Sequence, residues 1–71
     1  MRRFLIIQMS PKDVWYQLHG YFEGKMMECD EEGKYRLVDP HDIDRLFRST
    51  RLENSKGFML SPFTILEEIK Q

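Results

Sequence analysis

The sequence predicts a small α+β domain, and the placement of its prolines is the main reason. All three prolines follow a residue that can cap a helix, in the pairs Ser10-Pro11, Asp39-Pro40 and Ser61-Pro62. Ser and Asp side chains accept the free N–H groups of a first helical turn, and proline suits the next position because it lacks an N–H. Each pair follows an apolar stretch and precedes an amphipathic one. We therefore expect strands and helices to alternate along the chain.

Length and composition fit a single compact domain over residues 1–71. The chain is 41% hydrophobic and 13% aromatic, which is enough for a core, and its net charge of −1 is uninformative about an anionic partner. A lone cysteine cannot form an intramolecular disulfide, which favours a reducing compartment. The apolar run over residues 4–7 is too short for a secretory signal or a membrane span. We expect a cytoplasmic protein that does not enter a membrane.

The first half is predicted to contain a strand, a short helix and a β-hairpin. Arg3 to Met9 is apolar and β-branched in its middle, as in a buried strand. A helix of about two turns is expected between the cap at Ser10 and the stop at Gly20. Tyr21 to Cys29 and Lys34 to Val38 flank a four-residue connection that ends in glycine, which is typical of a hairpin.

The second half is predicted to contain two helices with a strand between them. The helix that follows Asp39 carries an apolar stripe of Ile43, Leu46 and Phe47. A turn over residues 54–57 precedes a strand from Phe58 to Leu60. The stretch from Pro62 to Lys70 is expected to be a third helix.

The resulting order, β-α-β-β-α-β-α, resembles in outline the ferredoxin-like split βαβ layout. The expected architecture is a small antiparallel sheet with two to three short helices. An alternative remains open, because Val14, Tyr16 and Leu18 also alternate as in a strand. With the stretch from Val14 to Phe22 extended, the sheet would close into an SH3-like small barrel with helical insertions.

No motif indicates catalysis. Cys29 with His19 or His41 would be a nucleophile and base by residue type alone, and there is no glycine-rich phosphate loop. The histidines, the cysteine and the aspartates fit no metal-binding spacing. We therefore expect no catalytic residues, no metal, no cofactor and no enzymatic activity.

An excess of large apolar side chains points instead to binding. Trp15, Tyr16, Tyr21 and Phe22 lie within eight residues, and neighbouring residues of a helix or strand cannot all face one core. Exposed aromatic residues are typical of protein-binding hot spots. We therefore predict a protein-binding surface that includes Trp15, Tyr16 and Tyr21.

Arginines define a second predicted surface. Arg45, Arg48 and Arg51 share one face of a helix if it continues that far, and Arg2 and Arg3 add a basic tip at the N-terminus. A charged face of this kind orients a domain against its partner. The expected function is a non-catalytic, protein-binding regulator of a larger protein or assembly, such as an enzyme or a transcription complex. A homodimer also remains open.

The alternative function is nucleic-acid binding through the Arg45–Arg51 face and the predicted strand at Phe58. Lys56, Gly57 and Phe58, with Phe63, match the two ends of an RNA-recognition consensus in which aromatic side chains stack on bases. The four intervening residues do not match it.

Overall fold

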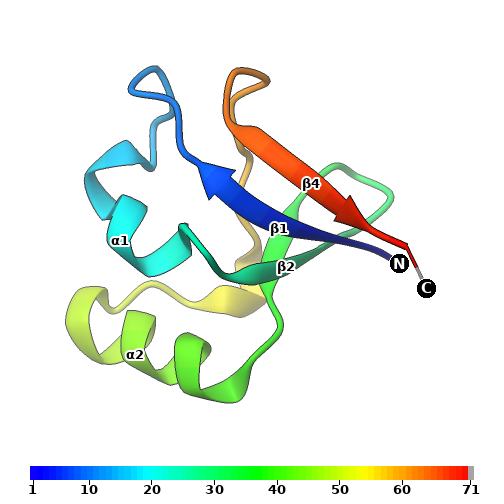
Figure 1. The fold of residues 1–71 in the computed structure, drawn as a ribbon. Helices are drawn as coiled ribbons and strands as arrows, with labels where there is room; N and C mark the ends of the chain where they lie inside the picture. The colour runs from blue at the N-terminus through cyan, green and yellow to red at the C-terminus, as the bar shows by residue number, and fades with distance from the viewer. Residues whose placement is uncertain (71) are drawn as a thin grey trace.

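The sheet has four antiparallel strands in the order β3-β2-β1-β4 in the computed structural model, which describes residues 1–70 (Figure 1). The strands are β1 (Arg2–Gln8), β2 (Met26–Cys29), β3 (Tyr35–Leu37) and β4 (Ile65–Ile69). The helices are α1 (His19–Phe22) and α2 (Pro40–Thr50), with 3₁₀ turns η1 (Tyr16–Leu18) and η2 (Asn54–Lys56). The predicted α+β class with a small antiparallel sheet is confirmed.

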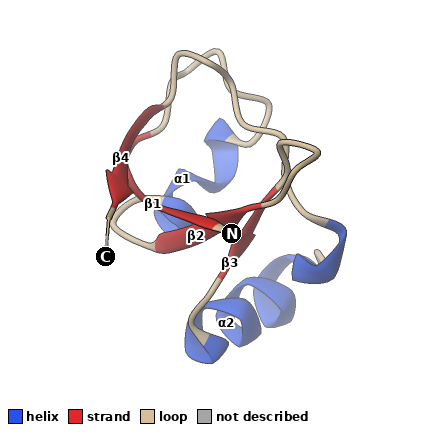
Figure 2. Ribbon diagram, turned by 90° about the vertical axis from the view of Figure 1, so that its right-hand side faces the viewer, coloured by secondary structure: helices blue, strands red, loops and turns tan. Residues whose placement is uncertain are grey.

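The core lies on one side of this sheet. Alternate residues of β1 and β2, such as Ile6 and Met27, point to that side and are fully buried. They pack with side chains from the helices and loops: Met9, Phe22, Leu37, Leu46 and Phe58. α1 lies behind β1 in Figure 2, and no helix covers the face of β1 and β2 turned toward the viewer.

The prediction that a helix begins at Ser10 and ends at Gly20 is wrong. The Ser10 side chain accepts the Lys12 N–H at 3.1 Å, and its carbonyl accepts the Asp13 N–H at 2.9 Å, so these residues form a turn. Asp13, three residues after Ser10, bonds to Ser61 and Thr64 instead of completing a helix cap. Helical structure therefore begins only at η1, and Gly20 lies inside α1 instead of ending it.

The predicted third helix over Pro62 to Lys70 is also wrong. Ser61 forms a local turn, because its hydroxyl accepts the Phe63 N–H at 3.1 Å and its carbonyl accepts the Thr64 N–H at 3.0 Å. The following residues pair with β1 as strand β4. The expected strand at Phe58 is reduced to one bridge with Tyr35. The order of elements therefore differs from the predicted one, and the sheet does not close into an SH3-like barrel.

Other elements agree more closely. The Asp39 side chain accepts the His41 N–H at 2.8 Å and caps α2 with proline in the first turn, as predicted. The hairpin forms with shorter arms, because Tyr21 and Phe22 belong to α1. In its turn, the Asp30 carboxylate accepts the Lys34 N–H at 3.0 Å and lies 2.6 Å from the Arg36 guanidinium. The Arg36 hydrogen bond holds the pKa of Asp30 below its ordinary value.

The outer edge of β3 is closed by contacts from the segment after α2. Tyr35 and Phe58 exchange two backbone hydrogen bonds of 2.8 and 2.7 Å. At Leu37 the Asn54 side chain takes the place of a strand, since its oxygen accepts the Leu37 N–H at 2.8 Å and its amide donates to the Leu37 carbonyl at 3.0 Å. Every outward-facing backbone group of β3 is thereby paired.

Replacement of Asn54 by Ala should lower the free energy of unfolding by about 1–3 kcal/mol, because Leu37 is buried and would lose both bonds. Chemical denaturation measures this loss. Ser55→Ala is the matched control, since only the backbone carbonyl of Ser55 is used, by Arg36. Equal stability of the two variants would show that Asn54 does not close this edge.

Candidate interaction surface

The aromatic residues predicted to form one patch are not equally exposed. Trp15 is half-buried, with its ring edge-on to the buried Phe58 at 5.0 Å between centroids. Tyr21 is also half-buried and packs against the core. Tyr16 is 37% exposed and stacks on His19. Of the three, Tyr16 alone presents much of its ring to solvent.

The arginines predicted to form one basic face each make a separate local contact or lie apart from the others. Arg45 lies over the Tyr21 ring at 4.5 Å from its centroid, so two residues predicted on separate surfaces meet where α1 contacts α2. Arg48 pairs with Asp44 at 3.0 Å. Arg51 lies beyond the end of α2 in a left-handed conformation with φ 65°. Arg45 and Arg48 therefore share α2, whereas Arg51 does not continue it.

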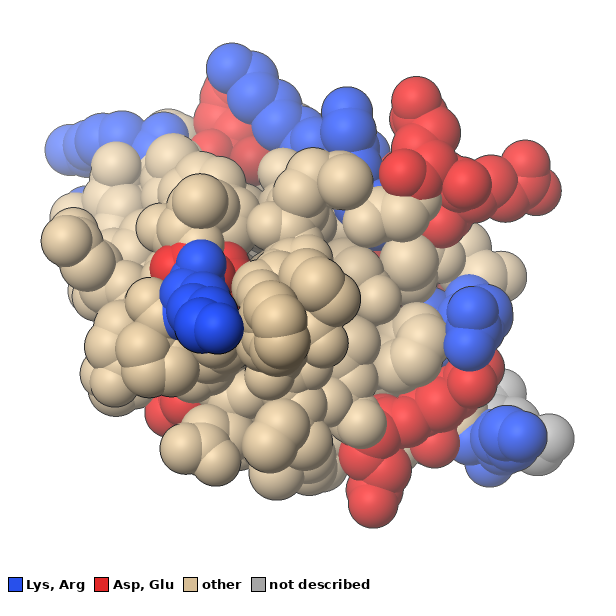
Figure 3. All heavy atoms as spheres, turned by 90° about the horizontal axis from the view of Figure 1, so that it is seen from above, with Lys and Arg blue, Asp and Glu red and all other residues tan. Residues whose placement is uncertain are grey.

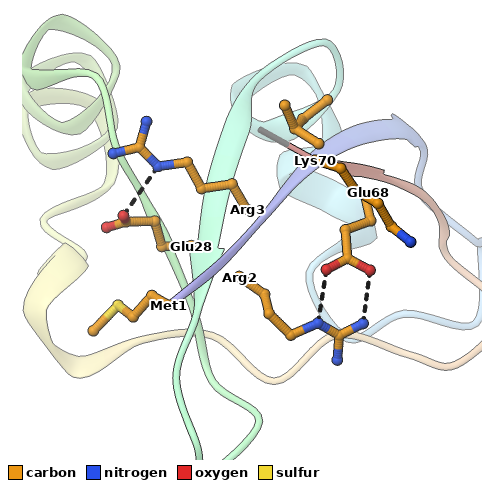
Figure 4. Close-up of a pocket in the computed structure, with 7 residues that line it drawn as sticks. Met1, Arg2, Arg3, Glu28, Glu68 and Lys70 are labelled. Atoms are coloured by element: carbon orange, nitrogen blue, oxygen red, sulfur yellow. Dashed lines mark hydrogen bonds and ion pairs between the residues drawn. The ribbon is translucent and has the colours of Figure 1, made fainter.

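The two N-terminal arginines are both paired (Figure 4). Arg2 donates two hydrogen bonds of 2.9 Å to Glu68, which holds the pKa of that carboxyl below its ordinary value. Arg3 donates to Glu28 at 3.1 Å. As neighbours in a strand they point to opposite faces of the sheet. The basic tip is therefore two separate ion pairs at an open hollow of about 580 Å³.

A different apolar surface lies at the end of the sheet where β1 ends and β4 begins. We call it the apolar end face, formed by the exposed residues Ile7, Pro11, Tyr16, Phe63 and Ile65. Its most exposed large apolar side chains are those of Phe63, at 62%, and Ile65, at 52%. Two open hollows of about 410 and 180 Å³ lie side by side here and share Gln8, Met9 and Pro11. These shared residues make the surface continuous.

Few charges interrupt this face. Figure 3 looks onto this end of the molecule and shows a broad surface of uncharged residues, with one basic side chain and a few acidic atoms beside it. Lys12 and Asp13 are the only charged residues in the loops over 9–16 and 59–64. The Lys12 ammonium lies 4.5 Å from the centroid of the Phe63 ring, and Asp13 is buried. The surface therefore combines exposed rings with the Lys12 cation, and the His19–Glu23 pair lines the larger hollow at its margin.

The Asp13 carboxylate holds the two loops of the end face together. One oxygen accepts the Trp15 N–H at 2.9 Å. The other accepts the Ser61 N–H at 2.8 Å and the Thr64 hydroxyl at 2.7 Å. Thr64 in turn accepts the Ser10 N–H at 3.1 Å. These bonds join residues 10–15 to residues 61–64.

A second carboxylate, that of Glu23, also stabilises the apolar end face. Glu23 accepts the Met9 N–H at 2.9 Å and lies 3.1 Å from the His19 ring. The bond from Met9, followed by that from His19, holds the pKa of Glu23 below its ordinary value. Met9 is the buried residue between the two hollows. The bond to Glu23 and the burial of its side chain therefore fix Met9 between the two hollows.

Sequence reasoning missed most of this face because it placed Phe63 in a third helix. The available signal was proline after a serine cap, which marks a turn as readily as a helix start. Exposed apolar residues after such a turn are Val14 and Phe63. Conversely, Phe58 is 2% exposed, so its ring is not available to stack on a base.

Further findings set the context of this surface. Among residues 1–70, no three His, Cys, Asp or Glu side chains come together as a potential metal site. No helix in that same part of the chain is both long and apolar enough to cross a membrane. Searches for similar proteins found no matching family model, no matching curated protein and no matching solved structure.

Asp13→Ala should lower the free energy of unfolding by about 2–4 kcal/mol, because it leaves buried donors of both loops unpaired. Equilibrium denaturation measures the effect. Asp44→Ala is the matched control; it removes an exposed pair with Arg48 and should cost at most about 0.5 kcal/mol. A similar small loss for both variants would contradict the role given to Asp13.

Proposed function

We propose that this protein is a non-catalytic, protein-binding regulator that acts on a larger protein or assembly through the apolar end face. The observation that carries the proposal is the exposure of Phe63, Ile65 and Tyr16 on one continuous, nearly uncharged surface. Exposed aromatic and branched side chains around shallow hollows are typical of the centre of a protein interface.

The hydrogen bonding of this region also favours binding over chemistry. The carboxylates nearest the end face, Asp13 and Glu23, are occupied by backbone N–H groups and side chains of the fold itself. Such groups hold loops in place and are not free to move protons to a substrate. The rigid loops present apolar side chains at a low entropic cost of binding.

The nucleic-acid alternative receives less support. One of its two elements, Phe58, is buried against Trp15 and Phe22. The arginines of its other element make contacts within the domain, with Tyr21, Asp44 and Phe47. The protein-binding proposal uses Tyr16, Phe63 and Ile65, which stay exposed although Tyr16 stacks on His19 and Lys12 lies over the Phe63 ring.

Site-specific photo-cross-linking tests the proposal. A photoreactive phenylalanine analogue at position 63 should give a discrete adduct with one protein in cells that express this chain. Phe63→Ala should weaken the isolated complex by at least about tenfold, as expected for a buried aromatic anchor.

The same analogue at Phe47 is the matched control, because that ring is also exposed but lies on α2. An identical adduct pattern from both positions, or no adduct from position 63, would refute binding through the apolar end face.

A further inference from the structure

The two edge strands of the sheet, β3 and β4, differ in whether their outward backbone groups are paired. The unpaired edge, β4, is a candidate binding site for an extended peptide segment. β3 is closed by Phe58 and Asn54, whereas β4 pairs with β1 alone among the described residues. We propose that β4 binds an extended segment of a partner protein in which a basic residue has an apolar residue two positions away on either side, and that this segment adds a fifth strand to the sheet. The inference extends the proposed function by naming the chemistry of a partner.

The backbone geometry fixes which groups would bind. Ile6 donates to the Lys25 carbonyl at 3.1 Å and accepts the Gly24 N–H at 2.8 Å, so its polar groups point toward β2. Polar groups of neighbouring strand residues point in opposite directions, so those of Leu5 point toward β4. Its partner in the register is Glu67. The N–H and C=O groups of Leu66 and Glu68 therefore point outward, away from β1.

The side chains of β4 determine which residue types would be complementary in an added strand. Ile65, Glu67 and Ile69 share the uncovered face of the sheet, because their neighbours Leu66 and Glu68 stand opposite Ile6 and Phe4 on the core side. Glu67 is exposed and has no ion pair within residues 1–70. A lysine or arginine opposite Glu67, with apolar residues on either side opposite Ile65 and Ile69, is the complementary pattern.

The same charges disfavour a second copy of this chain as the occupant. An antiparallel, two-fold pairing that uses all five residues of β4 places Glu67 opposite the same residue of the second copy. Like charges directly opposite each other destabilise a strand pair. Charge on an edge strand is a common device against self-association. A lysine or arginine of a partner opposite Glu67 would instead attract this carboxylate.

Amide hydrogen exchange with a synthetic probe tests the proposal. The probe is a blocked peptide with the order Val, Ile, Thr, Lys, Thr, Ile, Val, whose pattern is the same in both directions. Without it, the amides of Leu66 and Glu68 should exchange quickly and those of Glu67 and Ile69 slowly, because the latter face β1. Saturating probe should slow exchange at Leu66 and Glu68 by at least about tenfold, since both would then be hydrogen-bonded.

Charge reversal tests the side-chain part. Glu67→Lys should weaken binding of the lysine probe about fivefold and strengthen binding of a probe with glutamate in place of lysine, because a cross-strand ion pair changes sign. Glu31→Lys is the matched control, since Glu31 is exposed in the β2–β3 turn away from β4. It should change neither affinity.

Three results would overturn the inference: no added protection at Leu66 and Glu68, equal affinities of both probes for the Glu67→Lys variant, or protection at these amides that rises with protein concentration without probe. The last would make a second copy the occupant. None of these results bears on cross-linking at position 63, so failure of this inference and failure of the proposed function are separable.

Discussion

The buried carboxylate of Asp13 is the interaction on which the rest of this structure depends. It joins the loop after β1 to the loop before β4 through the Ser61 N–H and the Thr64 hydroxyl. With the loops joined in this way, Tyr16, Phe63 and Ile65 are left exposed to solvent. A charge that is buried must be fully hydrogen-bonded, and this one also sets where β4 begins. The loops that carry the apolar end face are thus held together by a buried carboxylate.

The same loops determine how the sheet ends. The loop before β4 delivers Ile65 to β1 at a bulge, where the register shifts between Ile6 and Gln8. A bulge increases local twist and turns the strand end away from the plane of the sheet. On the opposite side, the segment after α2 returns to β3 and uses a single asparagine in place of a strand. The β3 edge is therefore closed by other parts of the chain. The β4 edge is not covered by another described segment and carries the charged residues Glu67 and Glu68.

The sequence predicted those parts of the fold that rest on local chemistry. The cap at Asp39, the α2 helix and the hairpin around Asp30 each follow from residues within a few positions of one another. The errors at Ser10 and Ser61 have one cause. A serine before proline offers the same acceptor to a helix or to a tight turn, and the choice was made by Asp13, which reaches across 48 residues to Ser61. Local patterns cannot reveal such a contact, so the pattern at Ser61 could not decide between a helix start and the turn that leaves Phe63 exposed.

The most direct measurement of this account is a double-mutant cycle between Asp13 and Thr64. Asp13→Ala, Thr64→Val and the double variant are unfolded by denaturant, and the coupling free energy is taken from the four stabilities. If the carboxylate joins the loops as described, the coupling should be about 1–3 kcal/mol. A coupling within about 0.3 kcal/mol of zero would mean that the two residues act independently, as additive sites do. It would contradict the view that Asp13 holds the apolar end face together.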